Sequence, residues 1–415
     1  MAFFTVIIIL LPLLVSFGFS IKKFDIRPAR VYNKRYFKLF TPLFVLFLLL
    51  SFLFARQGLD TGYSWYYLTR DHKLIETNFY EGLKIYDAKK VHKMKLKGEL
   101  TFYSLFHEEN RYVYDCTLSR IIRLDTSDYT LAVLYEAPAK RHIRASVWKT
   151  EQMIAFIEMK RDYSDRQFVV LDENTKTFKK IPLDNRPIQN LYNPNIFGTN
   201  TIEGQRYWLL YAWRSQEEKQ IFSMWEDGRI EHIGKSQKWP LYINRMLITY
   251  TEEEVIISKE KNSEFEIVKK IPNPDGYRFG YGYFYRNDLN TASVKQVYGW
   301  KRPSWKDDET EWKYATLNLE SFKIEPIEIE GVRGYLFYSG PDNVYFEEID
   351  STSLTVKIYK LEDDRVTLLK TFEDFDPREP ANRHFTFPSG IVLRKGKKVK
   401  VYAFPDLREL KYKKL

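Results

Sequence analysis

Cysteine is almost absent from this 415-residue chain, and the only one, Cys116, cannot form an intramolecular disulfide bond. The fold must therefore be stable without disulfides, which excludes a small disulfide-rich scaffold and suits a bacterial envelope protein. Cys116 ends the alternating stretch Tyr112–Cys116, which has the pattern of a strand end. We expect a buried thiol with no part in any chemistry.

Sequence motifs for catalysis, cofactors and metals are also missing. The chain has no P-loop, no G-x-S-x-G and no G-x-G-x-x-G. Its histidines form neither an HExxH nor an HxH pair, so we predict no metal site, no cofactor and no catalytic histidine. The six are His72, His92, His107, His142, His232 and His384.

Charged residues are missing from two apolar segments, residues 2–20 and 39–55. About 20 apolar residues cross a bilayer as a helix, so these segments predict two transmembrane helices, at about 2–20 and 38–55. Residues 21–38 carry seven basic residues and one acid, Asp25. The positive-inside rule places this loop in the cytoplasm, and both termini and everything after Arg56 on the other side of the membrane.

An alternative reading makes the first apolar segment a cleaved signal peptide. Its start is uncharged, and Val15–Ser20 is a poor match to a small-residue cleavage site. The lack of any polar face also argues against a buried core helix. We therefore divide the chain into a membrane anchor, residues 1–57, and an extracytoplasmic domain, residues 58–415. The predicted location is the cell (inner) membrane.

Net charge indicates topology and does not point to a nucleic-acid partner. The chain has 65 Lys and Arg against 55 Asp and Glu, a net charge of +10. Residues 1–54 carry seven bases and one acid, so they supply +6 of this charge. A basic pI that comes mostly from an anchor loop predicts no nucleic-acid binding.

Helical periodicity is absent after Gly58, where short apolar–polar alternations recur instead. The 30 Tyr, 30 Phe and nine Trp favour strands. Eight segments share one form, a strand, a polar turn and a second strand, as in Phe168–Asp172 followed by Phe178–Ile181. Further strand-like runs precede most of these hairpins, for example Ile143–Trp148, Arg206–Trp213 and Leu241–Tyr250. The turns fall near residues 87, 125, 172, 227, 261, 318, 363 and 406.

The mean spacing of these turns is about 46 residues, which matches one four-stranded propeller blade. The chain therefore resembles a generic β-propeller repeat protein, although it carries no family signature such as a WD40 or kelch motif. We predict an all-β domain of seven or eight blades, with one blade split between the termini as a common form of ring closure. Two tandem β-sandwiches are the alternative architecture.

One aromatic, glycine-containing run, Gly276–Tyr285, is the candidate ligand-binding segment. It follows a loop rich in Pro and Asn, and its rings could stack on sugars or grip a peptide. The alternative is a strand with aromatic side chains on both faces, whose glycines mark tight packing. The candidate ligand-binding residues are Tyr277, Arg278, Tyr281, Tyr283 and Tyr285.

Charged clusters offer weaker candidates. Paired carboxylates can cleave glycosides, and the runs Asp307–Glu309 and Glu252–Glu254 supply such residues, yet both read as solvated turns. The basic run Arg394–Lys400 reads as a hairpin tip, which could meet acidic lipid or polysaccharide or simply be solvated.

These features favour a membrane-anchored, extracytoplasmic scaffold that binds a protein or a glycan and has no enzymatic activity. One transmembrane helix would be enough to anchor the domain, so two helices suggest that they also contact a membrane or envelope protein. The chain would then be a subunit of a membrane complex. The alternative is a membrane-tethered hydrolase or lyase that acts on envelope polysaccharide. Carboxylates or histidines that converge at the mouth of the channel would favour the enzyme.

Overall fold

The computed structural model describes most of residues 64–415; residues 65–415 are the second of the two units into which the chain divides. It leaves out residues 1–63, 79–81, 95–104, 110, 185–186, 189–190, 216, 262–263, 281–293, 302–311, 330–331, 339–343, 351–353, 363–364, 374, 377–378, 380–381, 397 and 413–415.

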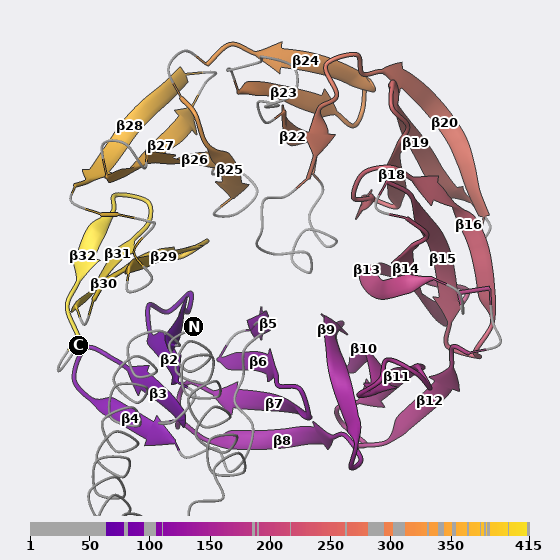
Figure 1. The fold of residues 1–415 in the computed structure, drawn as a ribbon, viewed down its shortest axis with the longest axis horizontal. Coiled ribbons are helices and arrows are strands. Elements are labelled where there is room, and N and C mark those ends of the chain that lie inside the picture. The colour runs from indigo at the N-terminus through magenta and orange to yellow at the C-terminus, as the bar shows by residue number, and fades with distance from the viewer. Residues whose placement is uncertain are drawn as a thin grey trace, which may run out of the picture. The chain divides into compact units, whose positions relative to one another are not determined.

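The described residues form eight four-stranded antiparallel sheets, which follow one another around a ring as propeller blades (Figure 1). Blade 1 contains β1 (Ser64–Leu68), β2 (Leu74–Asn78), β3 (Gly82–Tyr86) and β4 (Val91–Met94). Blade 2 contains β5 (Leu105–Glu109), β6 (Tyr112–Cys116), β7 (Arg120–Asp125) and β8 (Leu131–Glu136). Blade 3 contains β9 (Arg141–Lys149), β10 (Met153–Lys160), β11 (Gln167–Asp172) and β12 (Phe178–Pro182). Blade 4 contains β13 (Tyr192–Ile202), β14 (Gln205–Trp213), β15 (Lys219–Trp225) and β16 (Ile230–Ser236).

The second half of the ring has the same arrangement. Blade 5 contains β17 (Leu241–Ile243), β18 (Met246–Tyr250), β19 (Glu254–Lys261) and β20 (Glu264–Pro272). Blade 6 contains β21 (Arg278–Phe279), β22 (Gln296–Lys301), β23 (Lys313–Asn318) and β24 (Lys323–Ile327). Blade 7 contains β25 (Tyr335–Tyr338), β26 (Val344–Asp350), β27 (Thr355–Glu362) and β28 (Arg365–Phe372). Blade 8 contains β29 (Asn382–Phe387), β30 (Gly390–Lys395), β31 (Lys398–Ala403) and β32 (Arg408–Leu410).

The predicted all-β propeller is therefore confirmed for the described residues, with eight blades. Each of the eight predicted hairpins is the pair of third and fourth strands of one blade. The fourth strands lie on the outside of the ring, as β8, β12 and β20 do in Figure 1. Two tandem sandwiches are excluded because no sheet has the long, crossed strand order that they require.

The hydrophobic core lies between blades, because a single sheet cannot bury both of its faces. One cluster joins Phe168 of blade 3 to Trp208 of blade 4, and another joins Ile248 of blade 5 to Val297 of blade 6. Seven such clusters cover all eight junctions between neighbouring blades. Cys116 lies in one of them, where burial raises the pKa of its thiol, and the predicted buried thiol is confirmed.

Ring closure differs from the form that we expected from the sequence. Each blade is built from one continuous segment, and no sheet combines strands from both ends of the chain. Blades 8 and 1 join through a shared core that contains Leu68 and Val392. Two hydrogen bonds support it, from Ser389 Oγ to the Leu68 carbonyl at 2.7 Å and from the Tyr412 hydroxyl to the His72 carbonyl at 2.7 Å.

The predicted membrane anchor, residues 1–57, lies outside the described residues. In the part of the chain that the structure describes, no helix has the length and apolar character needed to cross a membrane. The anchor helices and the domain boundary at residue 57 stay predictions.

Candidate functional site

Exposed aromatic side chains gather on one face of the ring. We call it the entry face, because the first strand of every blade begins at this face. The second and fourth strands of each blade end at the same face, since neighbouring strands are antiparallel. By strand direction, four of the five exposed aromatic residues of the described chain lie at the entry-face end of a blade: Trp65, Tyr163, Tyr192 and Trp239. Exposed aliphatic side chains lie mostly on fourth strands: Val133, Ile267, Val268 and Leu368. The exposed aromatic side chains therefore lie mostly apart from the exposed aliphatic side chains. A face that exposes aromatic residues and few aliphatic ones is a candidate binding surface.

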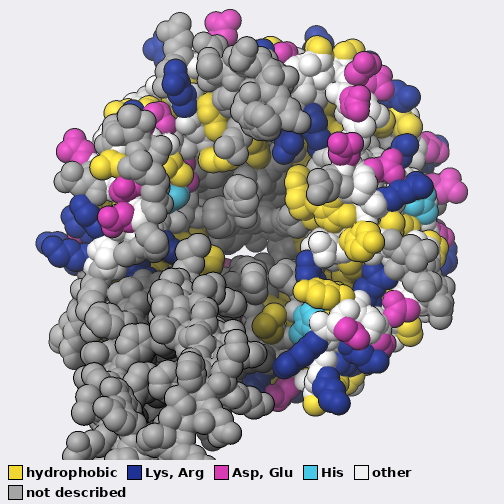
Figure 2. Space-filling model, in the orientation of Figure 1, with side chains coloured by type: hydrophobic (Ala, Val, Ile, Leu, Met, Phe, Trp, Pro, Cys, Tyr) yellow, Lys and Arg dark blue, Asp and Glu magenta, His cyan; other side chains and the backbone are white. Residues whose placement is uncertain are grey.

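The most distinctive part of the entry face combines two tryptophans with three cations. We call it the Trp239 patch, and it consists of Trp213, Lys219, Lys238, Trp239 and Arg278. Trp213 ends β14, Lys219 begins β15, and Arg278 begins β21. Lys238 and Trp239 lie in the connection from β16 to β17. The patch is therefore assembled from blades 4, 5 and 6. In Figure 2, hydrophobic side chains and Lys or Arg side chains lie near each other around the central hollow of the ring.

The tryptophan rings of the patch are held by other rings. Trp239 is 45% exposed, yet its ring meets Trp213 edge-to-face at a centroid distance of 5.4 Å and Tyr211 at 5.2 Å. Tyr192 pairs with Trp213 across the two strands, so their side chains share one face of the blade. An exposed ring that is fixed by two edge contacts is preorganised for stacking.

The two lysines of the patch are held by backbone carbonyls and aromatic faces. Lys219 is 2% exposed; its Nζ donates to the Gln237 carbonyl at 3.0 Å and lies 4.1 Å from the centre of the Trp213 ring. Lys238 Nζ donates to the Gly276 carbonyl at 2.7 Å and lies 5.7 Å from the Tyr250 ring centre. These contacts fix both ammonium groups without neutralising them.

Among the described residues, the charge of the patch is entirely positive. Burial and the charge of Arg278 lower the pKa of Lys219 from 10.5 to about 8. Burial, Arg278 and Lys301 lower the pKa of Lys238 to about 8. Both lysines remain mostly charged at pH 7, and neither they nor Arg278 form an ion pair with a carboxylate among the residues that the structure describes. Lysines whose pKa is lowered by burial and by a neighbouring cation are typical of functional sites.

The five ligand-binding residues predicted from the sequence lie in different environments in the structure, or outside the described residues. Tyr277 is buried in the core between blades 5 and 6, and its backbone N–H donates to Asn273 Oδ1 at 3.0 Å. Arg278, the next residue, is exposed and belongs to the Trp239 patch. Tyr281, Tyr283 and Tyr285 lie outside the described residues. Phe279 packs closely on Gly299, where a Cβ would lie 2.6 Å from the Phe279 ring, so at least this part of the run is a tightly packed strand.

Sequence reasoning missed Trp213, Lys219, Lys238 and Trp239. The adjacent pair Lys238-Trp239 was the available signal, an aromatic ring beside a cation before Pro240. The convergence of residues 213–219, 238–239 and 278 depends on the ring and has no signature in the order of the residues.

The other charged candidates of the sequence lie apart from this patch. Glu252 and Glu253 are exposed turn residues between β18 and β19, and residues 307–309 lie outside the described residues. Arg394–Lys400 spans the β30–β31 hairpin tip as predicted, and Arg394 itself is buried, with Nε donating to the Gly396 carbonyl at 2.9 Å. Among the described residues, no group of three or more His, Cys, Asp or Glu side chains is placed to hold a metal ion.

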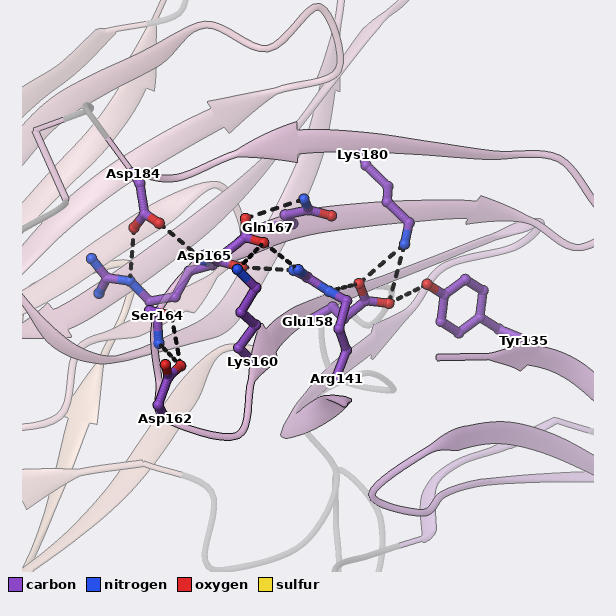
Figure 3. A network of polar contacts seen from close by, with 11 residues as sticks. Tyr135, Arg141, Glu158, Lys160, Asp162, Ser164, Asp165, Gln167, Lys180 and Asp184 are labelled. Carbon is purple, nitrogen blue, oxygen red and sulfur yellow. Dashed lines mark hydrogen bonds and ion pairs between the residues drawn. The ribbon is translucent and has the colours of Figure 1, made fainter. Parts of the chain in front are cut away.

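Buried carboxylates form a second set of polar sites, of which Glu158 is the most enclosed (Figure 3). Its side chain is fully buried and accepts hydrogen bonds from Tyr135, Arg141 and Lys180, the last at 3.0 Å. Arg141 continues to Asp165, which it meets at 2.6 Å. Because Tyr135 belongs to blade 2 and the other residues to blade 3, this network fastens one blade to the next. Its donors saturate the carboxylate, which leaves no free lone pair for acid–base chemistry.

Similar Glu–Tyr contacts recur at other junctions of the ring. Glu260 of blade 5 accepts from Tyr207 of blade 4 at 2.5 Å, and also from Tyr242 at 2.9 Å. Glu108 of blade 2 accepts from Tyr67 of blade 1 at 2.8 Å. Burial is the largest cause that raises the pKa of Tyr207 and of Glu108. We interpret these carboxylates as structural links between blades, in contrast to the cations of the Trp239 patch, which have no carboxylate partner among the described residues.

Comparisons with known proteins identify no family for this chain. No protein-family model and no curated protein matches the sequence. The chain is similar to the solved structure of AztD from Citrobacter koseri, with 9% identity, 82% of this chain and 91% of that chain covered, and a TM-score of 0.47. It is also similar to an oligogalacturonate lyase in complex with manganese (11% identity, 68% and 84% covered, TM-score 0.42). TolB from Acinetobacter baumannii is a third (11% identity, 62% and 62% covered, TM-score 0.34). At these identities and TM-scores, the likeness carries no argument about the family or the function of this chain.

Proposed function

We propose that this protein is a membrane-anchored, extracytoplasmic β-propeller that binds a protein or glycan ligand through its entry face. The observation that carries the proposed binding function is the Trp239 patch, where three cations without a carboxylate partner in the described structure gather beside fixed tryptophan rings. Such a surface costs folding free energy, since burying an unpaired cation is unfavourable. A surface of this kind is best explained by a ligand that supplies the missing negative charge.

The proposed location is supported by the two charge-free segments and the basic loop between them. With this topology the propeller lies outside the cytoplasm, in the cell envelope, where it meets envelope proteins and glycans and no nucleic acid. The two helices would then also be available to a membrane partner, with the chain as subunit of a complex. No arrangement of described residues specifically favours a polysaccharide hydrolase or lyase, so binding is the function that we propose.

Site-specific labelling tests the location. In a Cys116→Ala background, single cysteines are placed at Lys269, an exposed residue of β20, and at Asn33 in the basic loop. A membrane-impermeant maleimide should label Lys269→Cys in intact cells and Asn33→Cys only after permeabilisation. The reverse pattern would place the propeller in the cytoplasm and contradict the proposed location.

Binding to isolated envelope material tests the site. The full-length protein in detergent should bind the envelope fraction, and Arg278→Ala should reduce this binding. Lys269→Ala, which removes a cation of the same charge from the outer strand of blade 5, is the matched control and should bind as the wild type does. Equal binding by all three proteins would show that the Trp239 patch is not the site.

A further inference from the structure

The Trp239 patch has two kinds of accessible group, an aromatic ring and a cation, and their combination narrows the ligand. Trp239 is almost half exposed, and Arg278 is exposed at the first residue of β21. Lys219 is buried and cannot touch a ligand directly, but its charge lies 5.5 Å from the centre of the Trp239 ring. The ligand therefore meets a ring and a guanidinium, with additional positive charge beneath them.

The positive charge favours an anionic ligand. Arg278 lies near enough to Lys219 and Lys238 for its charge to lower the pKa of both ammonium groups. An anion that approaches this cluster is attracted by three cations at once, and a carboxylate can take two parallel hydrogen bonds from the Arg278 guanidinium. The charge alone does not distinguish an acidic sugar from an acidic peptide.

The surroundings of the patch distinguish these two ligands. The core of a protein–protein interface is more apolar than the rest of the surface and is depleted of charged residues, whereas the Trp239 patch has three cations at its centre. The exposed aliphatic residues closest in sequence to the patch, Ile267 and Val268, lie on β20, the outer strand of blade 5. Beside Trp239 the exposed hydrophobic residues are aromatic, with Tyr192 70% exposed opposite Trp213. A sugar ring has an apolar C–H face that packs on such rings and hydroxyls that remain in water, so this composition fits a sugar.

We propose that the Trp239 patch binds an acidic oligosaccharide, with one sugar ring stacked on Trp239 and its carboxylate paired with Arg278. Lys238 and Lys219 hold the surrounding potential positive. Tyr192 offers a second ring for a neighbouring sugar of the same chain. This inference rests on the proposed function and deepens it by naming the ligand class.

Calorimetric titration of the full-length protein in detergent tests this assignment. The probe is a tetramer of galacturonic acid, and the comparison ligands are its fully methyl-esterified form, hexaglutamate and inorganic phosphate. The acidic tetramer should bind at least tenfold more tightly than its neutral ester, because the ester lacks the charge, and more tightly than hexaglutamate or phosphate, because these lack the ring. Equal or tighter binding of hexaglutamate or phosphate would overturn the proposal in favour of a site for an acidic peptide or a simple anion.

Paired substitutions separate the two halves of the site. Arg278→Ala and Trp239→Ala should each weaken tetramer binding about tenfold, which corresponds to the loss of one charge-assisted hydrogen bond or one stacked ring. Trp239→Phe keeps an aromatic ring at this position and should retain most of the affinity for the tetramer. Weak binding by Trp239→Ala together with normal binding by Trp239→Phe would then be caused by the missing ring. Lys269→Ala and Phe178→Ala remove an exposed cation and an exposed ring of outer strands and should leave the affinity unchanged within about twofold.

The outcomes also separate this inference from the proposed function. Patch-dependent binding of the envelope fraction without binding of the acidic tetramer would refute the acidic sugar and leave the binding function intact. Tetramer binding that survives both alanine substitutions would refute the assignment to the Trp239 patch. A cytoplasmic propeller in the labelling experiment would refute the proposed location, whatever the calorimetry shows.

Discussion

At the scale of single residues, the interior of this propeller is held by buried carboxylates as well as by apolar contacts. Glu158 has no exposed surface and is shared by Tyr135, Arg141 and Lys180, which come from two blades. Removing one partner of a buried ion pair leaves the other charges without compensation. Carboxylate links of this kind give the polar residues of the interior a structural role.

We expect Glu158→Ala to lower the free energy of unfolding by about 3–5 kcal/mol, because Arg141 and Lys180 lose their buried counter-ion. Tyr135→Phe should cost about 1–3 kcal/mol, since one buried acceptor loses a donor. Asp165→Asn is the control: Asp165 is 40% exposed, so its pair with Arg141 should contribute about 1 kcal/mol or less. Urea denaturation followed by tryptophan fluorescence measures all three, and a Glu158→Ala protein as stable as Asp165→Asn would contradict the role of Glu158 as a structural link.

His384 should make the junction of blades 7 and 8 sensitive to pH. Burial opposes its charged form, but the charge of Glu347 and a hydrogen bond to it outweigh burial and raise the pKa of His384 above 6.5. Its Nε2 lies 2.7 Å from Glu347 Oε1, and Thr386 donates to the other oxygen of Glu347 at 3.1 Å. A raised pKa in the folded state means that this pair stabilises the fold below pH 6.5.

This stabilisation should disappear as the pH rises through the folded-state pKa of His384. The stability difference between the wild type and His384→Asn should therefore be larger at pH 6 than at pH 9. Denaturation of both proteins at the two pH values measures it, and His232→Asn, at an exposed histidine, is the control. A difference that stays constant or grows with pH would show that His384 does not act through its charge.

At the scale of elements, the outer strands could be located in every blade, whereas the inner strands could be located only in some, such as β9 and β14. The third and fourth strands of each blade alternate clearly and are joined by polar turns, so all eight pairs could be located. β13 shows the opposite case, because it contains Pro194 and Gly198, which read as turn residues. Two register shifts absorb this irregular segment, and a Cβ at Gly198 would lie 2.9 Å from the Tyr242 ring. Close packing between blades 4 and 5 requires a residue without a side chain at position 198, and this packing cannot be read from the sequence.

The run Leu241–Tyr250, which the sequence predicts as one strand-like segment, consists of two strands in the structure. β17 and β18 are joined by Asn244-Arg245, and both residues have positive φ, 48° and 59°. A two-residue loop with positive φ at both positions is the usual hairpin connection. Arginine is an unusual residue there, and its pair with Glu260 at 3.4 Å accounts for it.

The loop between β13 and β14 gives a test of this turn chemistry. Glu203 and Gly204 have φ values of 50° and 79°, and a Cβ at Gly204 would meet nothing within 4 Å. Gly204→Ala should therefore cost about 1 kcal/mol through backbone strain alone. Glu203→Asn should stabilise the fold by up to about 1 kcal/mol, since asparagine tolerates this conformation. Thermal unfolding measures both changes, and shifts of the same sign would contradict the turn assignment.

At the scale of the whole molecule, the candidate site was less predictable than the fold. The repeat spacing could be read from the sequence because every blade obeys it. Arg278 could be named from its segment, but Lys219 and Trp239 reach it only because blades 4, 5 and 6 are neighbours in the ring. Sites of this kind are built by tertiary structure, so their residues show no common spacing.

Closure of the ring is the other property of the whole molecule. Because every described blade is continuous, blades 8 and 1 share no sheet and are joined by side-chain packing and by hydrogen bonds such as those from Ser389 and Tyr412. Stability in repeat architectures is close to a sum of terms for each unit and each junction. Weakening one junction should therefore act mainly on the two blades that share it.

Leu68 and Leu247 allow a matched test of this locality. Both side chains are buried, Leu68 in the core that joins blades 8, 1 and 2 and Leu247 in the core between blades 4 and 5. Each change to alanine should cost about 2–5 kcal/mol. Hydrogen exchange should accelerate in β1–β8 and β29–β32 for Leu68→Ala, and in β13–β20 for Leu247→Ala. Acceleration over all eight blades in both variants would contradict a ring of separable junctions, because it would mean that the propeller opens only as a whole.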